Sequence, residues 1–118
     1  MRESLAPQER IRKKKDFLIL YKKGNRYRGK YFNLIYFSNT LTYSRVGVVA
    51  SKKIGNAVVR NKVKRWMREL FRRNKKLLDL PVDLLLVATA EIGQVTWAEL
   101  KEHYLLAVRK IFEKKRER

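Results

Sequence analysis

The hydrophobic and polar positions in the first half of the chain predict one helix followed by two strands. Residues 14–23, closed by Gly24, predict a short helix, because glycine commonly follows the last helical turn. Residues 31–37 (YFNLIYF) and 45–50 (RVGVVA) are rich in aromatic and branched side chains, which predicts two strands. The turn-like residues 25–30 leave room for a short edge strand.

The second half predicts a helix, a strand and a last helix. A long helix is predicted over 56–73, because the stretch begins with asparagine, a favoured N-cap. Residues 82–88 (VDLLLVA) form a nearly continuous apolar strand. A T-x-x-E capping box at Thr96 and Glu99 precedes a helix over 97–114. The order predicts an α/β (α+β) two-layer sandwich, with a small four-stranded mixed sheet packed against about three helices.

The helix over 56–73 separates into two faces when residues are placed 100° apart. The apolar side chains on one face predict a buried stripe, which consists of Val59, Val63, Trp66 and Leu70. The opposite face is polar and almost entirely cationic, and it consists of Asn61, Lys64, Arg65, Arg68 and Arg72, with Arg60 near one boundary.

The sign of the charge on this helix points to a partner. Ordinary solvated helices mix acidic and basic side chains at i,i+4, which stabilises each pair by a few tenths of a kcal/mol. Here positive charges recur at that spacing instead. A solvated amphipathic helix would explain the buried stripe, but it would not explain why the charged side chains are almost all positive. Lys52 and Lys53 extend the charge into the preceding loop, where backbone amides could also hold a phosphate. We call Lys52, Lys53, Arg60, Lys64, Arg65 and Arg68 the basic face, and we expect it to bind a phosphate backbone.

Composition supports a nucleic-acid partner. The 118 residues contain 30 Lys and Arg against 11 Asp and Glu, a net charge of +19, which disfavours a compact state unless a polyanion binds. The charge lies on segments with predicted structure, which favours nucleic acid over a membrane surface. We expect one RNA-binding domain over 1–118, with a basic arm over 1–15. The chain lacks cysteine, a signal-like apolar core and a span-length apolar run, so a cytoplasmic protein without a membrane partner is expected.

The sequence contains little that indicates catalysis by the polypeptide. His103 is the only histidine, and it is expected to be a surface residue within a helix. Asp79 and Asp83 are close enough in sequence to share a cation, although capping or solvation explains them as well. No nucleophile elbow, phosphate loop or spaced metal-ligand set is present. We therefore expect no catalytic and no metal-binding residues.

Residues 45–69, RVGVVASKKIGNAVVRNKVKRWMRE, closely resemble the signature of the bacterial ribonuclease P protein family. The resemblance extends over nearly the whole chain, from the basic arm and the phenylalanine-containing first helix to the strand VDLLLVA and the final basic helix. The chain departs from the family at one position of an Arg-Asn-Arg triplet, which is Arg60-Asn61-Lys62 here. Lysine keeps the charge at that position but lacks the two-point contact of arginine.

The resemblance implies a small protein partner of a catalytic RNA, which together remove the 5′ leader of precursor tRNA. The RNA would perform the hydrolysis with Mg²⁺ held mainly through the RNA, and no obligate protein partner is implied. The residues that correspond to the RNA-subunit contacts are Lys52, Lys53, Arg60, Asn61, Lys62, Lys64, Arg65 and Arg68. A cleft between the first helix and the sheet would bind the single-stranded leader through Phe17 and Tyr21. The family also implies a rare left-handed crossover from residues 45–50 through the charged helix to 82–88, against the usual right-handed form.

Two alternatives remain open from the residues alone. Phe17 and Tyr21 share a helical face, and rings beside Lys and Arg suit single-stranded RNA, but both rings could instead belong to the core. Both faces of the strand over 31–37 are apolar, so alternation does not decide which face lines the cleft. Charge and aromatic content also fit a free-standing RNA-binding module of ribosomal or RNA-chaperone type.

Overall fold

The structure, a computed structural model, describes residues 5–112 and contains the elements that the sequence predicts. The helices and strands are α1 (Lys14–Lys23), β1 (Asn25–Arg28), β2 (Phe32–Ser38), β3 (Arg45–Val49), α2 (Ala57–Arg73), β4 (Val82–Ala88) and α3 (Trp97–Phe112). The edge strand allowed for by the sequence is present as β1. The first residues of the predicted arm and the predicted end of the last helix lie outside the described residues.

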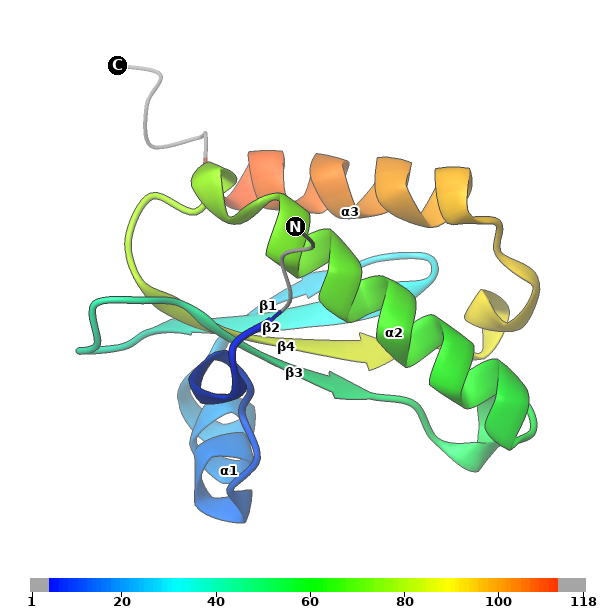
Figure 1. The fold of residues 1–118 in the computed structure, drawn as a ribbon, viewed down its shortest axis with the longest axis horizontal. Coiled ribbons are helices and arrows are strands. Elements are labelled where there is room, and N and C mark those ends of the chain that lie inside the picture. The colour runs from blue at the N-terminus through cyan, green and yellow to red at the C-terminus, as the bar shows by residue number, and fades with distance from the viewer. Residues whose placement is uncertain (1–4, 113–118) are drawn as a thin grey trace.

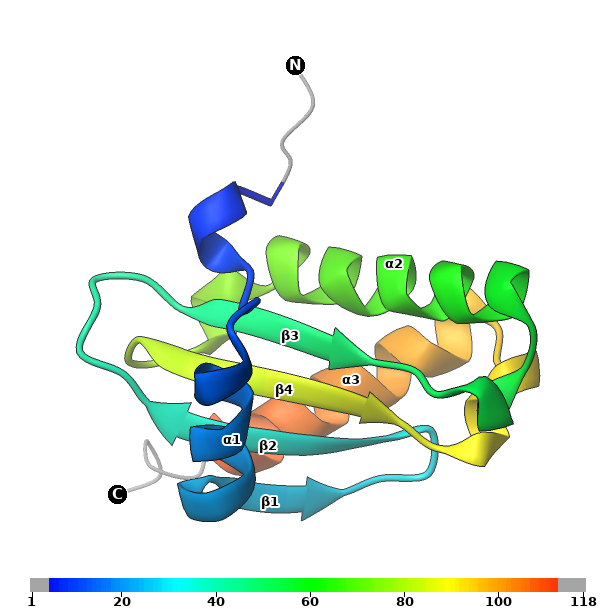
Figure 2. The ribbon, with the colours of Figure 1, turned by 90° about the horizontal axis from the view of Figure 1, so that it is seen from below.

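The strands form one mixed sheet in the order β1-β2-β4-β3, in which only β3 and β4 are parallel. Figure 2 views the sheet from the side of α1, with α2 on the far side. In this view β3 and β4 both run to the right with β4 below β3, and α2 returns to the left behind them. This path is a left-handed β-α-β crossover, so the prediction made against the right-handed rule is confirmed.

Helices cover the two faces of the sheet very unequally (Figure 1). On one face, α2 and α3 enclose the main core, to which β2 and β4 contribute Phe32, Leu34, Leu84 and Leu86. On the other face, α1 covers a second cluster of four buried residues, Ile11, Leu20, Ile35 and Leu85, with Phe17, Phe37, Val49 and Val87 packed against it. The sheet and the α2–α3 layer form the expected sandwich, and α1 adds a partial cover on the opposite side.

The buried stripe of α2 differs from the predicted one. Val63 and Leu70 are buried as expected, whereas Val59 and Trp66 are only partly buried and Met67 and Phe71 are fully buried instead. The cause is that α2 packs against both the sheet and α3, which turns the buried side toward positions 67 and 71. Trp66 lies at the border, where its ring meets the ring of Trp97 in α3 edge to face, at 5.7 Å between centroids.

Local capping signals function as the sequence predicts. The Oδ1 atom of Asn56 accepts a hydrogen bond from the Val59 N–H at 3.0 Å, which caps α2. Thr96 and Glu99 form the reciprocal capping box of α3. Gly24 caps α1, but with an extended backbone, φ −71°. Glycine is needed there because an added Cβ would lie 2.5 Å from Ile35 Cγ2 and 2.6 Å from a backbone oxygen.

Candidate nucleic-acid interface

The basic face lies on the outer side of α2 and on the 3₁₀ turn Lys52–Ile54 that precedes it. Three members of the basic face are exposed: Lys52, Lys53 and Arg65. The other three, Arg60, Lys64 and Arg68, are partly buried, and they add their positive charge to the same surface. Gly55 connects the turn to α2 with φ 149°, a conformation that favours glycine. The structure thus places all six predicted cations on one continuous segment, from the turn to the fourth turn of the helix.

Only the C-terminal end of α2 is neutralised. Glu69 accepts hydrogen bonds from both Arg72 and Arg73, with a distance of 2.6 Å between Arg73 Nε and Glu69 Oε2. The hydrogen bond from Arg72 is the main reason that the pKa of Glu69 falls to about 2. Within the described residues, no carboxylate forms an ion pair with any member of the basic face. The basic face is therefore left with uncompensated positive charge.

The three side chains of the triplet Arg60-Asn61-Lys62 point in different directions from α2, because successive helical residues lie about 100° apart. Asn61 is exposed beside the basic face, whereas Lys62 turns toward α3 and places its Nζ 5.0 Å from the centre of the Trp66 ring. The Nε of Arg60 is buried and has no hydrogen-bond partner in the described part of the chain. Lys62 thus contacts the ring of Trp66, whereas the other predicted RNA-binding residues have no such aromatic contact among the described residues.

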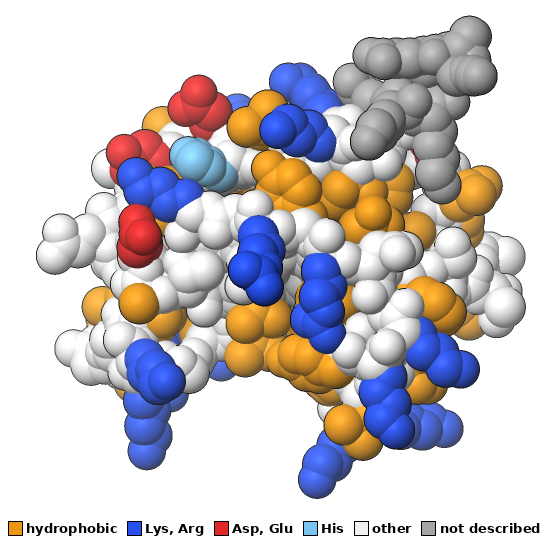
Figure 3. All heavy atoms as spheres, turned by 180° about the vertical axis from the view of Figure 1, so that it is seen from behind, with side chains coloured by type: hydrophobic (Ala, Val, Ile, Leu, Met, Phe, Trp, Pro, Cys, Tyr) orange, Lys and Arg blue, Asp and Glu red, His pale blue; other side chains and the backbone are white. Residues whose placement is uncertain are grey.

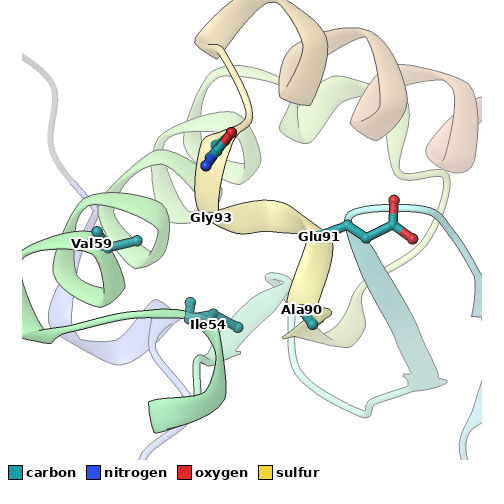
Figure 4. A pocket seen from close by; sticks show the side chains of 6 residues that line it. Ile54, Val59, Ala90, Glu91 and Gly93 are labelled. Carbon is teal, nitrogen blue, oxygen red and sulfur yellow. The ribbon is translucent and has the colours of Figure 1, made fainter.

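A hollow of about 560 Å³ lies beside the start of α2, lined by Ile54, Val59, Ala90, Glu91, Gly93 and Gln94 (Figure 4). Its lining combines the apolar residues Ile54, Val59 and Ala90 with the polar residues Glu91 and Gln94. The side chain of its one acidic residue, Glu91, points away from Ile54 and Val59. The lining contains no Lys or Arg residue, whereas Lys52 and Lys53 lie on the neighbouring turn.

The two predicted leader-binding aromatics occupy different environments on α1. The Phe17 ring lies over β3, where its Cε1 atom is 2.9 Å from the position that a Cβ on Gly47 would take. Gly47 therefore makes room for this ring, as expected from the sequence, in which this glycine indicated a close-packed position of the strand; the sequence did not indicate which side chain packs there. Tyr21, one turn later, is 40% exposed. Phe17 belongs in part to the second cluster, and Tyr21 is available to a ligand.

The structure also decides which face of the sheet α1 covers. It is the face of Asn33, Ile35 and Phe37, which alternation had left open. Next to α1, a row of partly or fully exposed residues crosses all four strands in register, and we call it the open row: Arg28, Asn33, Val87 and Val49.

The space-filling view shows a hollow on this underside (Figure 3). It lies between α1 and the region of the Lys52–Ile54 turn, with hydrophobic side chains inside and Lys or Arg side chains on both flanks. We call this the sheet hollow. Acidic side chains and the histidine gather at the opposite, upper edge of the same view.

An ion-pair network that sequence reasoning missed fixes α1 to the sheet. Arg45 donates to both carboxylate oxygens of Asp83, at 2.9 and 2.6 Å, and its Nη1 lies 3.5 Å from Asp16 Oδ2 in α1. The hydrogen bond with Asp83 raises the pKa of Arg45. Asp83 is thus engaged with arginine rather than poised for a cation. Alternation along 45–49 could have indicated that Arg45 shares a face with Gly47, but not which acid it meets.

The remaining candidates for protein chemistry have structural partners. The ring of His103 meets the ring of Tyr31 edge to face at 4.8 Å. The described residues contain no group of three or more His, Cys, Asp or Glu side chains that could hold a metal ion. None of the helices in the described region is long and apolar enough to cross a membrane.

A strongly basic α+β protein with an uncompensated basic face, and with an apolar hollow flanked by Lys and Arg side chains (Figure 3), has the features of an RNA-binding protein. The sequence profile of the Ribonuclease P family matches residues 5–114. The chain is 39% identical over 94 residues to the ribonuclease P protein component of Thermotoga maritima, covering 80% of both chains. It is 34% identical over 113 residues to that of Petrotoga mobilis, covering 92% of this chain and 96% of the relative. The chain belongs to the ribonuclease P protein family.

Solved structures agree with this assignment. The RNase P protein of Staphylococcus aureus superposes with a TM-score of 0.81 at 32% identity, covering 87% of this chain and 94% of the other. The RNase P protein from Thermotoga maritima superposes with a TM-score of 0.77 at 36% identity, covering 86% and 96%. The arrangement of four strands and three helices is therefore shared with proteins of known family.

Proposed function

We propose that this chain assists the catalytic RNA of ribonuclease P by binding both that RNA and the single-stranded 5′ leader of precursor tRNA. Family membership makes the chain a protein subunit of an endoribonuclease that matures the 5′ ends of tRNA, with the RNA subunit as its partner. The observation that carries the proposal is the uncompensated basic face of α2, situated next to a hollow of different chemistry.

The basic face supports the contact with the RNA subunit. Arginine side chains can bind a phosphate through two parallel hydrogen bonds, and lysine adds point charge. The phosphates of a duplex or folded RNA lie along a line, and the cations of the basic face lie along the outer side of α2 and on the turn before it, so the two can pair. Asn61 can add a hydrogen bond within this surface. Lys62 would contribute through its charge and its contact with Trp66.

The sheet hollow supports the contact with the leader. A single-stranded RNA needs surfaces on which bases can stack and cations that can meet its phosphates. Tyr21 provides an exposed ring, Phe17 a partly exposed one, and the open row adds the polar ends of Arg28 and Asn33. The helical part of the basic face lies on the α2 side of the sheet and the sheet hollow lies on the α1 side (Figure 1), so both RNAs can be bound at once.

The described residues do not fit a magnesium site built by the polypeptide. Two carboxylates beside these surfaces are engaged with cations, Glu69 with Arg72 and Asp83 with Arg45, and the described residues contain no cluster of three or more possible metal ligands. Mg²⁺ prefers oxygen ligands with several retained waters, which the phosphates of an RNA supply well. We therefore assign Mg²⁺ and the hydrolysis to the RNA subunit, and no step of the reaction to a side chain.

We further propose that the chain acts as a single RNA-binding domain and that it works in the cytoplasm. A free-standing RNA-binding module is the competing function, since it too would use a basic helix and exposed rings.

Reconstitution with ribonuclease P RNA separates the two functions. The protein should increase cleavage of precursor tRNA by the RNA at low Mg²⁺, where the RNA alone is slow, and should cleave nothing by itself. A lysine-rich peptide of equal charge is the control for general charge screening. Binding to the RNA without any gain in cleavage over this peptide would favour the free-standing module.

A further inference from the structure

The N-terminal segment before α1 is attached to the free edge of the sheet. The Ile11 N–H donates to the Val46 carbonyl at 2.9 Å, and Arg10 pairs with Val46 in parallel register. Nearby, Glu9 is largely buried and its Oε2 lies 2.8 Å from Lys75 Nζ, just beyond α2. What the sequence presents as a basic arm is, in its described part, an additional edge of the sheet.

This attachment determines where the arm's arginines point. Ile11 is buried in the second cluster, on the α1 side of the sheet. The backbone at Arg10 is extended, with φ −99° and ψ 132°. Successive side chains of an extended segment alternate in direction, so Arg10 and Arg12 project to the opposite side from Ile11, toward α2.

Arg68, in α2, is close enough to Arg10 and Arg12 to be affected by their charges. Its pKa is lowered first by burial and then by the positive charges of Arg10 and Arg12. None of the three arginines has an ion pair with a carboxylate of the described residues. The acids that lie nearest in sequence are already engaged, Glu9 with Lys75 and Glu69 with Arg72 and Arg73.

We propose that Arg10, Arg12 and Arg68 form a composite site for a backbone phosphate of the RNA subunit, a proposal that rests on the function proposed above. Three guanidinium groups from two separate segments repel one another in the free protein. A phosphate between them removes this repulsion and accepts their forked hydrogen bonds. The site is on the α2 side of the sheet, which assigns it to the RNA subunit rather than to the leader.

The proposal predicts opposite effects on the free protein and on the complex. Removing two of the three charges relieves repulsion, so the free protein should become more stable at low salt. The same change removes a phosphate contact, so RNA binding should weaken. A purely structural role of the two arginines would instead lower the stability of the protein.

The test compares R10Q/R12Q with the control K101Q/K110Q, whose two lysines are exposed on α3. Both variants lose two positive charges. The melting temperature at low salt and the affinity for ribonuclease P RNA across a range of salt are measured for each. For R10Q/R12Q we expect a higher melting temperature, roughly tenfold weaker binding near 0.1 M salt, and a log–log salt slope smaller by about 0.7–0.9. The control should keep the wild-type slope.

Two outcomes would overturn the site at once: an unchanged slope in R10Q/R12Q, or an equal loss in the control. If the double variant melts below wild type, the test is repeated with R12Q, which leaves the paired residue Arg10 in place, and a lower melting temperature in R12Q as well would overturn the site. Failure of the wild-type protein to bind the RNA at all would overturn the proposed function instead.

Discussion

The two faces of the sheet have opposite designs. The face under α2 and α3 is closed by large side chains, and Leu34, Leu84 and Leu86 are completely buried there. The face under α1 has only a small buried cluster, and the open row beside it stays in contact with solvent. Since stability comes mainly from apolar area removed from water, most of it must come from the first face. The face under α1 contributes less to stability, so its residues can differ more in shape and polarity.

This difference teaches how a small basic protein can combine a fold with an extended RNA surface. Neighbouring residues of β4 belong to different tasks: Leu86 packs into the main core, and Val87 contributes to the open row. A helix of ten residues, α1, covers only part of its face and so leaves the sheet hollow beside it. The partial cover leaves a surface that is accessible to a ligand (Figure 3).

The largest expected effect comes from truncating two adjacent residues of β4 that face opposite sides of the sheet, Leu86 and Val87, to alanine. Leu86→Ala should reduce the free energy of unfolding by about 2–5 kcal/mol, because it leaves a cavity in the main core. Val87→Ala should reduce it by only about 1 kcal/mol, because Val87 is partly exposed. Urea denaturation of both variants measures the difference. Equal losses would mean that the two faces contribute alike to stability.

The next largest effect is expected from the aromatics of α1. Tyr21→Ala should weaken binding of precursor tRNA to the reconstituted complex by about 1–3 kcal/mol if its ring stacks on one base, and leave mature tRNA unaffected. Its melting temperature should change little, because the ring is exposed.

Phe17→Ala is the matched comparison for Tyr21→Ala. Phe17 packs over Gly47, so its removal should reduce both precursor binding and stability. If Tyr21→Ala impairs precursor and mature tRNA equally and also lowers the melting temperature, the ring belongs to the core instead of the leader site.

The sequence predicted much of this architecture, because its signals were local. Helix starts, for example, are marked by Asn56 and by the pair Thr96 and Glu99. Their side chains form hydrogen bonds within the first helical turn, so the residue types alone indicate where each helix begins. The left-handed crossover came from the family resemblance. No local pattern indicates the hand of a crossover, so periodicity alone would have favoured the right-handed form.

What the sequence could not give depends on contacts between distant segments. The buried side of α2 is set by its two neighbours, so Met67 and Phe71 replace Val59 and Trp66 in the stripe. The pairing of Arg45 with Asp83 joins residues 38 positions apart. The attachment of Ile11 to β3 likewise needs the sheet to exist first. The assignment of the basic face and of Phe17 and Tyr21 to RNA stays a prediction.

A smaller effect is expected when charge is removed from the basic face itself. K64Q/R65Q should lower the affinity for ribonuclease P RNA about tenfold near 0.1 M salt and reduce the log–log salt slope by about 1–2, because up to two phosphate contacts are lost. Unfolding by urea should be nearly unchanged, since neither side chain contributes to either apolar cluster. A salt slope equal to that of the wild type would exclude these residues from the interface.

The smallest effect concerns Glu69, the acid that neutralises the end of α2, and it disappears in acid. Its folded pKa of about 2 is below its ordinary value of 4.5, so the carboxylate stabilises the folded state above about pH 4.5, and this contribution is lost as the pH falls toward 2. The ion pairs with Arg72 and Arg73 are near the surface, so the contribution should be only about 1 kcal/mol at low salt. Denaturation of wild type and E69Q between pH 6 and pH 2 measures it. The two stabilities should differ near pH 6 and converge as the pH is lowered, because the wild-type carboxyl group becomes neutral like the amide. A difference that persists unchanged at pH 2 would show that Glu69 acts through its shape and not through its charge, and α2 would then lack the neutralised end that distinguishes it from the basic face.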